Sequence, residues 1–250
     1  MRLENKIAIV YGSGGAMGGT VARGFAREGA RVFLAGRTRS KLDAVAEEII
    51  AGGGEAETAE LDAFDRNAVN NHVDEVVERA GSVDISFNAV GITAVQGKPL
   101  VDMSLEDFLA PITEAARTHF VTATAAARRM TAQGSGVIVM LSSSAARESR
   151  HRMGGFNLAC ASIEAFTRSL AGEVGSEGVR VVCLRPNFTP ETTPGLGGGG
   201  SAVARRHAQR APAALGRSCR CGRIRSFRRR GRDDRRSHEP HLRRDRGLEA

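Results

Sequence analysis

Short apolar runs alternate with longer amphipathic segments through the first 185 residues of the chain. The first run, Ile7 to Val10, has the length and continuity of a strand buried on both faces of a parallel sheet. The other predicted strands span residues 31–35, 55–61, 84–88, 137–141 and 179–184. The predicted helices between them span residues 17–28, 40–51, 67–80, 113–130 and 154–174. This alternation predicts a doubly wound α/β domain of three layers, with helices on both faces of a parallel sheet.

A further helix is predicted to begin at Ser104, with Glu106 and Asp107 in its first turn. Pro111 is expected to limit its length, because proline lacks the N–H that a helix interior needs. The segment 113–130 is then a separate long helix, rich in alanine and threonine. Its small side chains permit close packing against the sheet or against a second subunit, so we expect a homo-oligomer through the two long helices.

The first predicted strand runs into a glycine-dense turn, K-I-A-I-V-Y-G-S-G-G-A-M-G-G over residues 6–19. Gly12, Ala16 and Gly18 have a G-x-x-x-G-x-G spacing, which differs from the common dinucleotide pattern G-x-G-x-x-G. Glycines let backbone amides approach a ligand, and a helix is predicted to begin directly after the turn. The pattern therefore indicates an anion site, with a glycine-rich turn that binds no ligand as the alternative.

The ends of the second and third predicted strands carry candidate residues for a nucleotide. In a doubly wound fold an acidic side chain after the second strand accepts from the ribose 2′-hydroxyl. Here Gly36 and Arg37 stand there, which favours a 2′-phosphate. Arg39 is either a second candidate or a residue of a solvated loop. Asp62 is placed to bind the adenine amino group, although Asp62 or Asp65 could instead cap the following helix.

The net charge of +8 comes entirely from the last fifth of the chain. Residues 1–200 contain 20 basic and 23 acidic side chains, whereas residues 201–250 contain 16 arginines, no lysine and 5 acidic side chains. An arginine-rich arm for nucleic acid is one interpretation of this segment. The other is a shifted reading frame, because arginine CGN codons read one nucleotide later encode mainly Gly, Ala, Val or Asp. The absence of lysine favours the shifted frame, so we do not expect a nucleic-acid partner.

Cysteine usage and hydropathy suggest a cytoplasmic protein. No apolar run has the length of a transmembrane helix, and the chain enters its first strand without a signal-peptide pattern, so we expect no membrane association. Cys160, Cys183, Cys219 and Cys221 show neither disulfide spacing nor a zinc-ligand framework. A reducing compartment and the absence of a metal site are the simplest expectations.

Five motifs in a fixed order resemble the short-chain dehydrogenase/reductase family over residues 3–194. They are the glycine turn, Asp62, D-I-S-F-N-A-V-G at 84–91, the serine run at 142–144, and the long helix before V-R-V-V-C-L-R-P. The resemblance implies a Rossmann-like fold, a nicotinamide cofactor and a small-molecule carbonyl or alcohol substrate. It places around the cofactor Gly12, Ser13, Gly18, Arg37, Asp62, Asn88 and Gly91. With Arg37 among them, NADP is favoured over NAD.

The catalytic positions implied by the same resemblance depart from the family pattern. Ser143 matches the serine that orients the carbonyl, but the tyrosine position falls on Phe156 and the lysine position on Cys160. The helix asparagine of the family falls near Ala115. Phenylalanine has no proton to give, and a neutral thiol cannot replace an ammonium as a multiple donor. Ordinary carbonyl reduction is therefore not expected.

No tyrosine elsewhere in the sequence takes the place of the missing proton donor, and two histidines remain to be considered. Tyr11, which is the only tyrosine in the chain, is expected on the cofactor side of the glycine turn. His119 and His151 are conceivable substitute acids, although a lone histidine is more often a packing or surface residue. Three functions stay open: an NADP-dependent oxidoreductase with a degenerate active site, a catalytically silent nucleotide-binding homologue, and a nucleic-acid binder acting through its tail.

The chain is expected to divide into a dinucleotide-binding domain over residues 1–194 and a Gly/Arg-rich tail over residues 195–250. The family places a substrate-covering helix, another helix and a seventh strand in the region of the tail. No pattern for these elements is found there, so six strands are recognisable and the seventh is missing or replaced. Without it, residues 181–184 become an exposed apolar edge.

Overall fold

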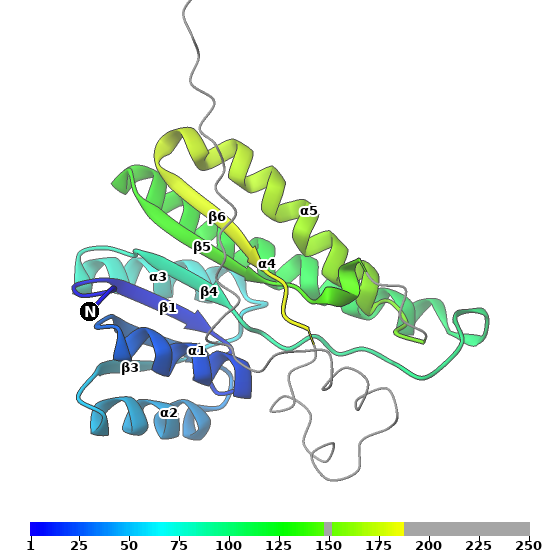
Figure 1. Ribbon diagram of the computed structural model, residues 1–250, viewed down its shortest axis with the longest axis horizontal. Helices are drawn as coiled ribbons and strands as arrows, with labels where there is room; N and C mark the ends of the chain where they lie inside the picture. The colour runs from blue at the N-terminus through cyan, green and yellow to red at the C-terminus, as the bar shows by residue number, and fades with distance from the viewer. Residues whose placement is uncertain (148–151, 188–250) are drawn as a thin grey trace, which may run out of the picture. The chain divides into compact units, whose positions relative to one another are not determined.

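The computed structural model describes residues 1–147 and 152–187 (Figure 1). The predicted tail, the missing seventh strand and His151 lie outside these residues. The elements follow in the order β1 (Ile7–Tyr11), α1 (Ala16–Arg27), β2 (Arg31–Gly36), α2 (Arg39–Ala51), β3 (Glu55–Glu60), α3 (Arg66–Ala80), β4 (Ile85–Asn88), η1 (Leu100–Asp102), α4 (Leu105–Gln133), β5 (Gly136–Leu141), η2 (Ser144–Ala146), α5 (Phe156–Val174), η3 (Gly175–Glu177) and β6 (Val179–Leu184). All six predicted strands are confirmed, each to within one residue at either end.

The described strands form one parallel sheet in the order β3-β2-β1-β4-β5-β6. The chain winds outward from β1 to β3 and then returns to begin the other half at β4. This is the predicted doubly wound α/β fold. In such sheets ligands bind at the carboxyl ends of the strands where the winding reverses, which here is the gap between β1 and β4.

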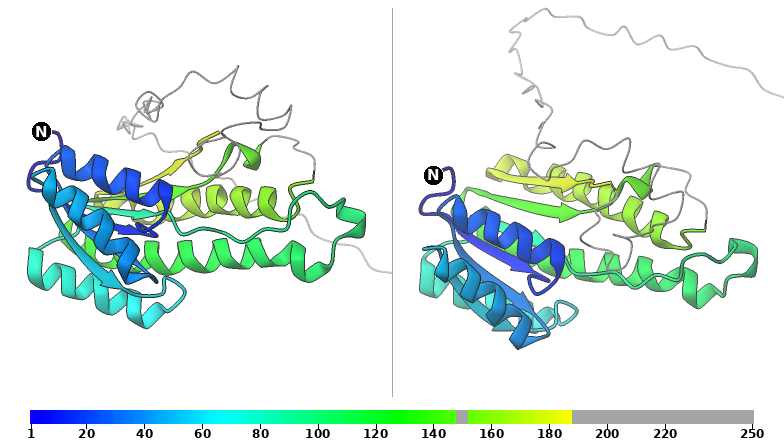
Figure 2. Two further views of the ribbon diagram at one scale, coloured as in Figure 1. Left: turned by 90° about the horizontal axis from the view of Figure 1, so that it is seen from below. Right: turned by 60° about the horizontal axis from the view of Figure 1, so that its bottom comes forward.

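Each face of the sheet has its own apolar core. α1 and α2 cover one face of the sheet, and α3, α4 and α5 cover the other (Figures 1 and 2). Ala8 and Val10 of β1 belong to the first core, and Ile9 and Tyr11 belong to the second. Successive side chains of a strand point to opposite faces, so a strand covered on both sides must be apolar at every position. This requirement explains the continuous apolar run in β1.

The predicted break at Pro111 is wrong, because α4 continues through it as a single helix of 29 residues. A proline inside a helix removes one hydrogen bond and costs about 3 kcal/mol, unless other contacts offset it. Pro111 is buried, and a Cβ added at Gly155 would lie 3.0 Å from its Cγ and 1.9 Å from the carbonyl oxygen of Phe108. The start of α5 therefore packs tightly on this turn of α4. This tertiary packing, which no local pattern reports, offsets the lost bond.

β6 is the edge strand of the sheet within the described residues. Val181 and Cys183 pack against the core on the α5 side, and Leu184 is 38% exposed. The exposed apolar edge expected at residues 181–184 depends on the residues after 187, which lie outside the described part of the chain, so it stays a prediction. Such an edge offers unpaired backbone groups to another strand.

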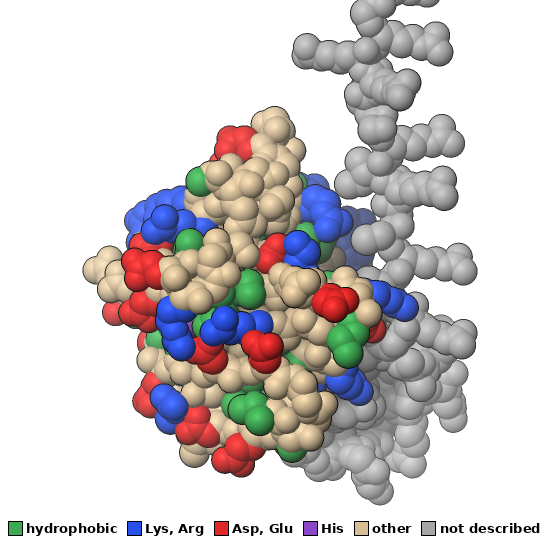
Figure 3. Space-filling view, turned by 90° about the vertical axis from the view of Figure 1, so that its left-hand side faces the viewer, with side chains coloured by type: hydrophobic (Ala, Val, Ile, Leu, Met, Phe, Trp, Pro, Cys, Tyr) green, Lys and Arg blue, Asp and Glu red, His purple; other side chains and the backbone are tan. Residues whose placement is uncertain are grey.

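Acidic and basic side chains are interspersed on the face of the molecule at the amino ends of the strands (Figure 3). Lys6 Nζ lies 2.8 Å from Asp84 Oδ1, and Arg31 Nη2 lies 2.5 Å from Glu57 Oε1. Charges paired in this way produce no extended field of one sign on this face. Among the described helices, none is both long enough and apolar enough to cross a lipid bilayer.

Candidate cofactor cleft and active site

A cleft of about 360 Å³ opens at the carboxyl ends of the strands, beside the glycine turn after β1. Gly12 has a φ of +73°, and a Cβ on it would lie 2.6 Å from the carbonyl oxygen of Ala89. A Cβ on Gly18 would lie 2.3 Å from the carbonyl oxygen of Gly12. Side chains at these two positions would fill the space between the turn, the end of β4 and the start of α1. Only glycine therefore fits at these two positions, where the turn packs against the end of β4 and the start of α1.

The helix that follows the turn begins without a side-chain cap. Its N-cap is Gly15, which makes no side-chain hydrogen bond to the first turn. The first N–H groups of a helix have no partner within the helix and attract anions. Together with the tight glycine turn, this arrangement fits the pyrophosphate of a dinucleotide.

Five of the seven predicted cofactor residues line the cleft, and two lie behind its wall. The lining residues are Gly12, Gly18, Arg37, Asp62 and Gly91. Ser13 is fully buried, and its Oγ donates to the carbonyl oxygen of Ala35 at 3.4 Å. Asn88 is also buried; its Nδ2 donates to Thr122 Oγ1 at 2.9 Å, while its Oδ1 accepts from the N–H of Val90 at 2.9 Å. These two residues fix the positions of the turn and of the β4 end.

The two aspartates near the end of β3 have separate tasks. Asp65 is the N-cap of α3 and accepts from the N–H groups of Asn67 at 2.8 Å and Ala68 at 3.1 Å. Asp62 accepts from the N–H of Phe64 at 3.0 Å and lines the cleft. Because Asp65 caps the helix, the carboxylate of Asp62 keeps acceptor capacity for a ligand.

The basic residues after β2 are arranged differently from the sequence expectation. Arg39 is the first residue of α2, and its Nε lies 2.8 Å from Asp43 Oδ1, one turn along the helix. It is not among the residues that line the cleft. Lys41, which the sequence analysis did not single out, lines the cleft together with Arg37 and Thr38. The helical periodicity of α2 places Lys41 on the side that faces the cleft. This can be worked out only when the first residue of the helix is known.

The serine, tyrosine and lysine positions of the family lie around η2 and the first turns of α5. Ser143 is half-buried, and its Oγ accepts from the N–H of Ala145 at 3.3 Å. Phe156 is the first residue of α5, and Cys160 follows one turn later with 1% exposure. Burial raises the pKa of the Cys160 thiol to about 11. A neutral thiol therefore stands at the lysine position, while Ala115 of α4 is fully buried.

A charged cluster that the sequence analysis missed lies beside these positions. Glu164 of α5 is 6% exposed and accepts from Arg185 Nη2 at 2.6 Å; Arg185 Nε also bonds to its carboxylate. Arg147 Nε and Ser142 Oγ each lie 3.4 Å from the same carboxylate. These bonds, above all that from Arg185, hold the pKa of Glu164 below its usual value. The cluster connects α5 to the ends of β5 and β6. In the sequence, its only sign is that Glu164 falls on the side of α5 that faces the core.

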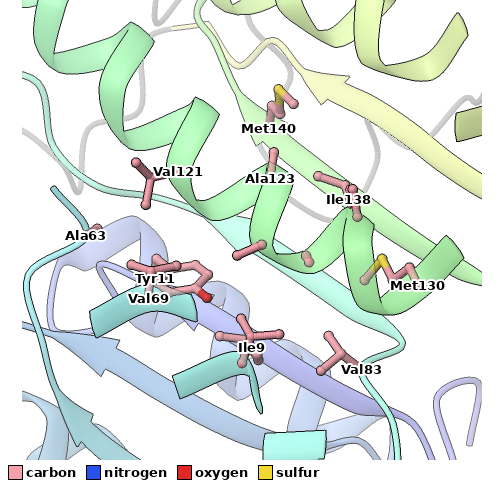
Figure 4. Packing of buried hydrophobic residues seen from close by; sticks show 14 of the residues in the cluster. Ile9, Tyr11, Ala63, Val69, Val83, Val121, Ala123, Met130, Ile138 and Met140 are labelled. Atoms are coloured by element: carbon pink, nitrogen blue, oxygen red, sulfur yellow. The ribbon is translucent and has the colours of Figure 1, made fainter. Parts of the chain in front are cut away.

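Tyr11 borders the cleft, but its ring is packed in the core on the α3–α4 side of the sheet. Its ring is fully buried in the core between β1, α3 and α4, close to Val69 and Ile9 (Figure 4). The ring stands edge-on to His72 at a centroid distance of 6.3 Å, and the hydroxyl has no hydrogen-bond partner among the described residues. Burial raises the pKa of Tyr11 far above its usual value. Tyr11 therefore lies beside the cofactor cleft as expected, but its hydroxyl group is buried in the α3–α4 layer.

His119 is also poorly suited to proton transfer at neutral pH. It is 2% exposed on α4, and its Nδ1 has no hydrogen-bond partner in the described part of the chain. Burial lowers the pKa of the imidazole to about 4, so the ring is neutral at pH 7. His119 lines an apolar groove between α4 and α5 and is not among the residues that line the cofactor cleft.

Comparison with known proteins identifies the family. A family model described as enoyl-(acyl carrier protein) reductase matches residues 13–226. The 3-oxoacyl-[acyl-carrier-protein] reductase of Chlamydia pneumoniae is 31% identical over 186 residues, covering 74% of each chain. Among solved structures, a metagenomic short-chain oxidoreductase in complex with NADP is 28% identical with a TM-score of 0.68, covering 76% of this chain and 85% of the other. NAD⁺-bound xylitol dehydrogenase is 27% identical with a TM-score of 0.72, covering 75% and 72%.

The chain belongs to the short-chain dehydrogenase/reductase family. The comparisons support an oxidoreductase of this type, and they favour neither the catalytically silent homologue nor the nucleic-acid binder. The named relatives include proteins described with NADP and with NAD⁺. A nicotinamide dinucleotide is therefore the cofactor class of the family, and the glycine turn described above fits it.

Proposed function

We propose that this chain is an NADP(H)-dependent oxidoreductase for a carbonyl or alcohol substrate, with an impaired active site. The observation that carries the proposal is the cleft itself. Gly12 and Gly18 form a turn with no room for side chains, and Arg37 lines the cleft where an acidic residue would select NAD. Residues 1–194 form the dinucleotide-binding domain in this proposal, and residues 195–250 form the tail.

The proposed chemistry at the active site is limited by two side chains. A bound nicotinamide cofactor supplies the hydride. Ser143, at the end of β5, has a hydroxyl that can orient a substrate carbonyl. Phe156 offers no proton to the developing alkoxide, and Cys160 carries no charge to hold a ribose hydroxyl. The cofactor site is therefore better preserved than the site of the reaction.

Self-association through α4 and α5 is a further part of the proposal. An apolar groove of about 580 Å³ lies between these helices. Phe120 is 47% exposed, and its ring lies 6.0 Å from that of Phe166. An exposed aromatic side chain beside an apolar groove favours a protein partner, and a second copy presents the same apolar face. Sedimentation of the native chain tests this part, and a monomer at micromolar concentration contradicts it.

A cytoplasmic location is also proposed. Cys160 and Cys183 are both free thiols in the structure. Thiols persist in a reducing compartment. Reaction with a membrane-impermeant thiol reagent in intact cells tests this, since labelling before lysis would contradict it.

NADPH should bind the native chain about tenfold or more tightly than NADH, and Arg37→Asp should remove this preference. A hydrogen bond to a charged group contributes about 1.5–3 kcal/mol, which corresponds to at least a tenfold change in affinity. Fluorescence titration of both cofactors measures the effect. Arg39→Ala is the matched control, because Arg39 is paired with Asp43 away from the cleft. Tighter binding of NADH to the native chain would refute the assignment.

A further inference from the structure

We infer that Lys41 is a second, specificity-determining cation for a 2′-phosphate on the adenosine ribose, beside Arg37. The inference rests on the proposed NADP(H) binding and names a residue that the strand-end pattern does not identify. Lys41 is the third residue of α2, whose first residue is Arg39. It lies on the side of this helix that lines the cleft.

The cations near the end of β2 differ in whether a carboxylate neutralises them. Arg23 of α1 lies 3.0 Å from Glu48, and Arg39 lies 2.8 Å from Asp43. Both are neutralised by carboxylates of α2, and neither lines the cleft. Arg37 and Lys41 do line it, and within residues 1–147 and 152–187 neither forms an ion pair. The positive charge available to a ligand at this end of β2 is therefore carried by Arg37 and Lys41.

Lys41 also lies close to the glycine turn. A Cβ built on Gly14 would lie 2.9 Å from the Cβ of Lys41. The stem of the lysine therefore starts directly against the turn, and the absence of a side chain at position 14 makes room for it. The ribose of a dinucleotide lies between the glycine turn and the end of β2 in a doubly wound fold. Lys41 borders the same space from α2, while Arg37 borders it from the strand end.

The exposure of Lys41 sets the size of the expected effect. Both Lys41 and Arg37 are exposed on the surface, so salt screens their attraction for a phosphate. A lysine ammonium acts on a phosphate as a point charge, without the fixed geometry of a guanidinium. We expect Lys41→Ala to weaken binding of a 2′-phosphate about tenfold at low salt, with a smaller loss at high salt.

The test compares adenosine 2′,5′-bisphosphate with adenosine 5′-monophosphate, which differ only in the 2′-phosphate. Calorimetric titration of the native chain, Lys41→Ala, Lys41→Arg and Arg39→Ala requires no turnover. Lys41→Ala should weaken binding of the bisphosphate about tenfold and leave binding of the monophosphate unchanged. Lys41→Arg should retain most of the affinity, and Arg39→Ala should match the native chain. Circular dichroism checks that each variant is folded.

The outcomes separate this inference from the proposal on which it rests. If the native chain prefers the bisphosphate and Lys41→Ala keeps that preference, the role of Lys41 is wrong and the NADP(H) assignment stands. If Lys41→Ala weakens binding of both ligands equally, the proposed role of Lys41 is also wrong, because the variant has then lost affinity at the cleft in general. If the native chain binds the two ligands equally, the NADP(H) preference and the role of Lys41 both fall.

Discussion

Reduction of ketones and aldehydes by the native chain should be about 10²- to 10⁴-fold slower than in a chain with an intact proton donor, even with NADPH bound. General acid catalysis supplies a factor of this size, and Phe156 at the tyrosine position cannot donate a proton. Cys160 does not replace the lysine, because its buried thiol stays neutral with a pKa of about 11. The rate of NADPH consumption over a panel of ketones and aldehydes measures this directly.

Restoring the two side chains tests the cause of the loss. Phe156→Tyr with Cys160→Lys should recover part of the activity, provided that the segment after about residue 195 is also replaced by an intact family C-terminus. Each single substitution serves as a control and should recover less than the pair. Rapid turnover by the native chain that His119→Ala or His151→Ala abolishes would overturn the account and assign the proton to a histidine.

The free energy of unfolding should fall by about 2 kcal/mol per histidine between pH 7 and pH 5, for His72 and for His119. Burial, with a smaller contribution from the charge of Arg79, lowers the pKa of His72 to about 4, and burial alone lowers that of His119 to about 4. In the unfolded chain both rings take up a proton near pH 6.5, whereas the folded chain excludes it until about pH 4. Stability is therefore present above pH 6.5 and is lost as the pH falls.

Urea unfolding at pH 7 and pH 5 measures this loss, and leucine substitutions identify its source. His72→Leu and His119→Leu should each remove about half of the difference between the two pH values. Within the described residues, both ring nitrogens of His72 and Nδ1 of His119 are buried without a partner. Leucine therefore breaks no hydrogen bond that the structure shows. Equal stability of the native chain at both pH values would contradict the predicted burial of neutral imidazoles.

The sheet was predictable because its signals are local. Every described strand is an apolar or alternating run between turn residues, and the parallel arrangement follows from the alternation with helices. The continuation of α4 through Pro111 was not predictable, since the contact with Gly155 comes from a segment more than 40 residues away. The free-energy cost of a proline arises within its own helix, whereas the packing that offsets this cost comes from a distant part of the chain.

The candidate site was predictable in position and less so in its individual side chains. The glycine turn, Arg37, Asp62 and Gly91 line the cleft as the motifs predict. Lys41 rather than Arg39 reaches the cleft, because Asp43 holds Arg39 along the helix. Tyr11 borders the cleft as expected, but the period of two in β1 turns its side chain into the core.

A fluorescence titration with NADPH, continued after a ketone is added, separates binding of the cofactor from its turnover. The account predicts saturable binding followed by a stable signal, because the cofactor site is kept while the proton donor is lost. Gly18→Ala should abolish binding, since its Cβ would lie 2.3 Å from the carbonyl oxygen of Gly12. Gly24→Ala in the same helix should not, because its Cβ would meet no atom within 4 Å apart from the neighbouring residues and the backbone of the helix. The absence of saturable binding to the native chain, or rapid loss of the bound NADPH signal after ketone addition, would contradict the account.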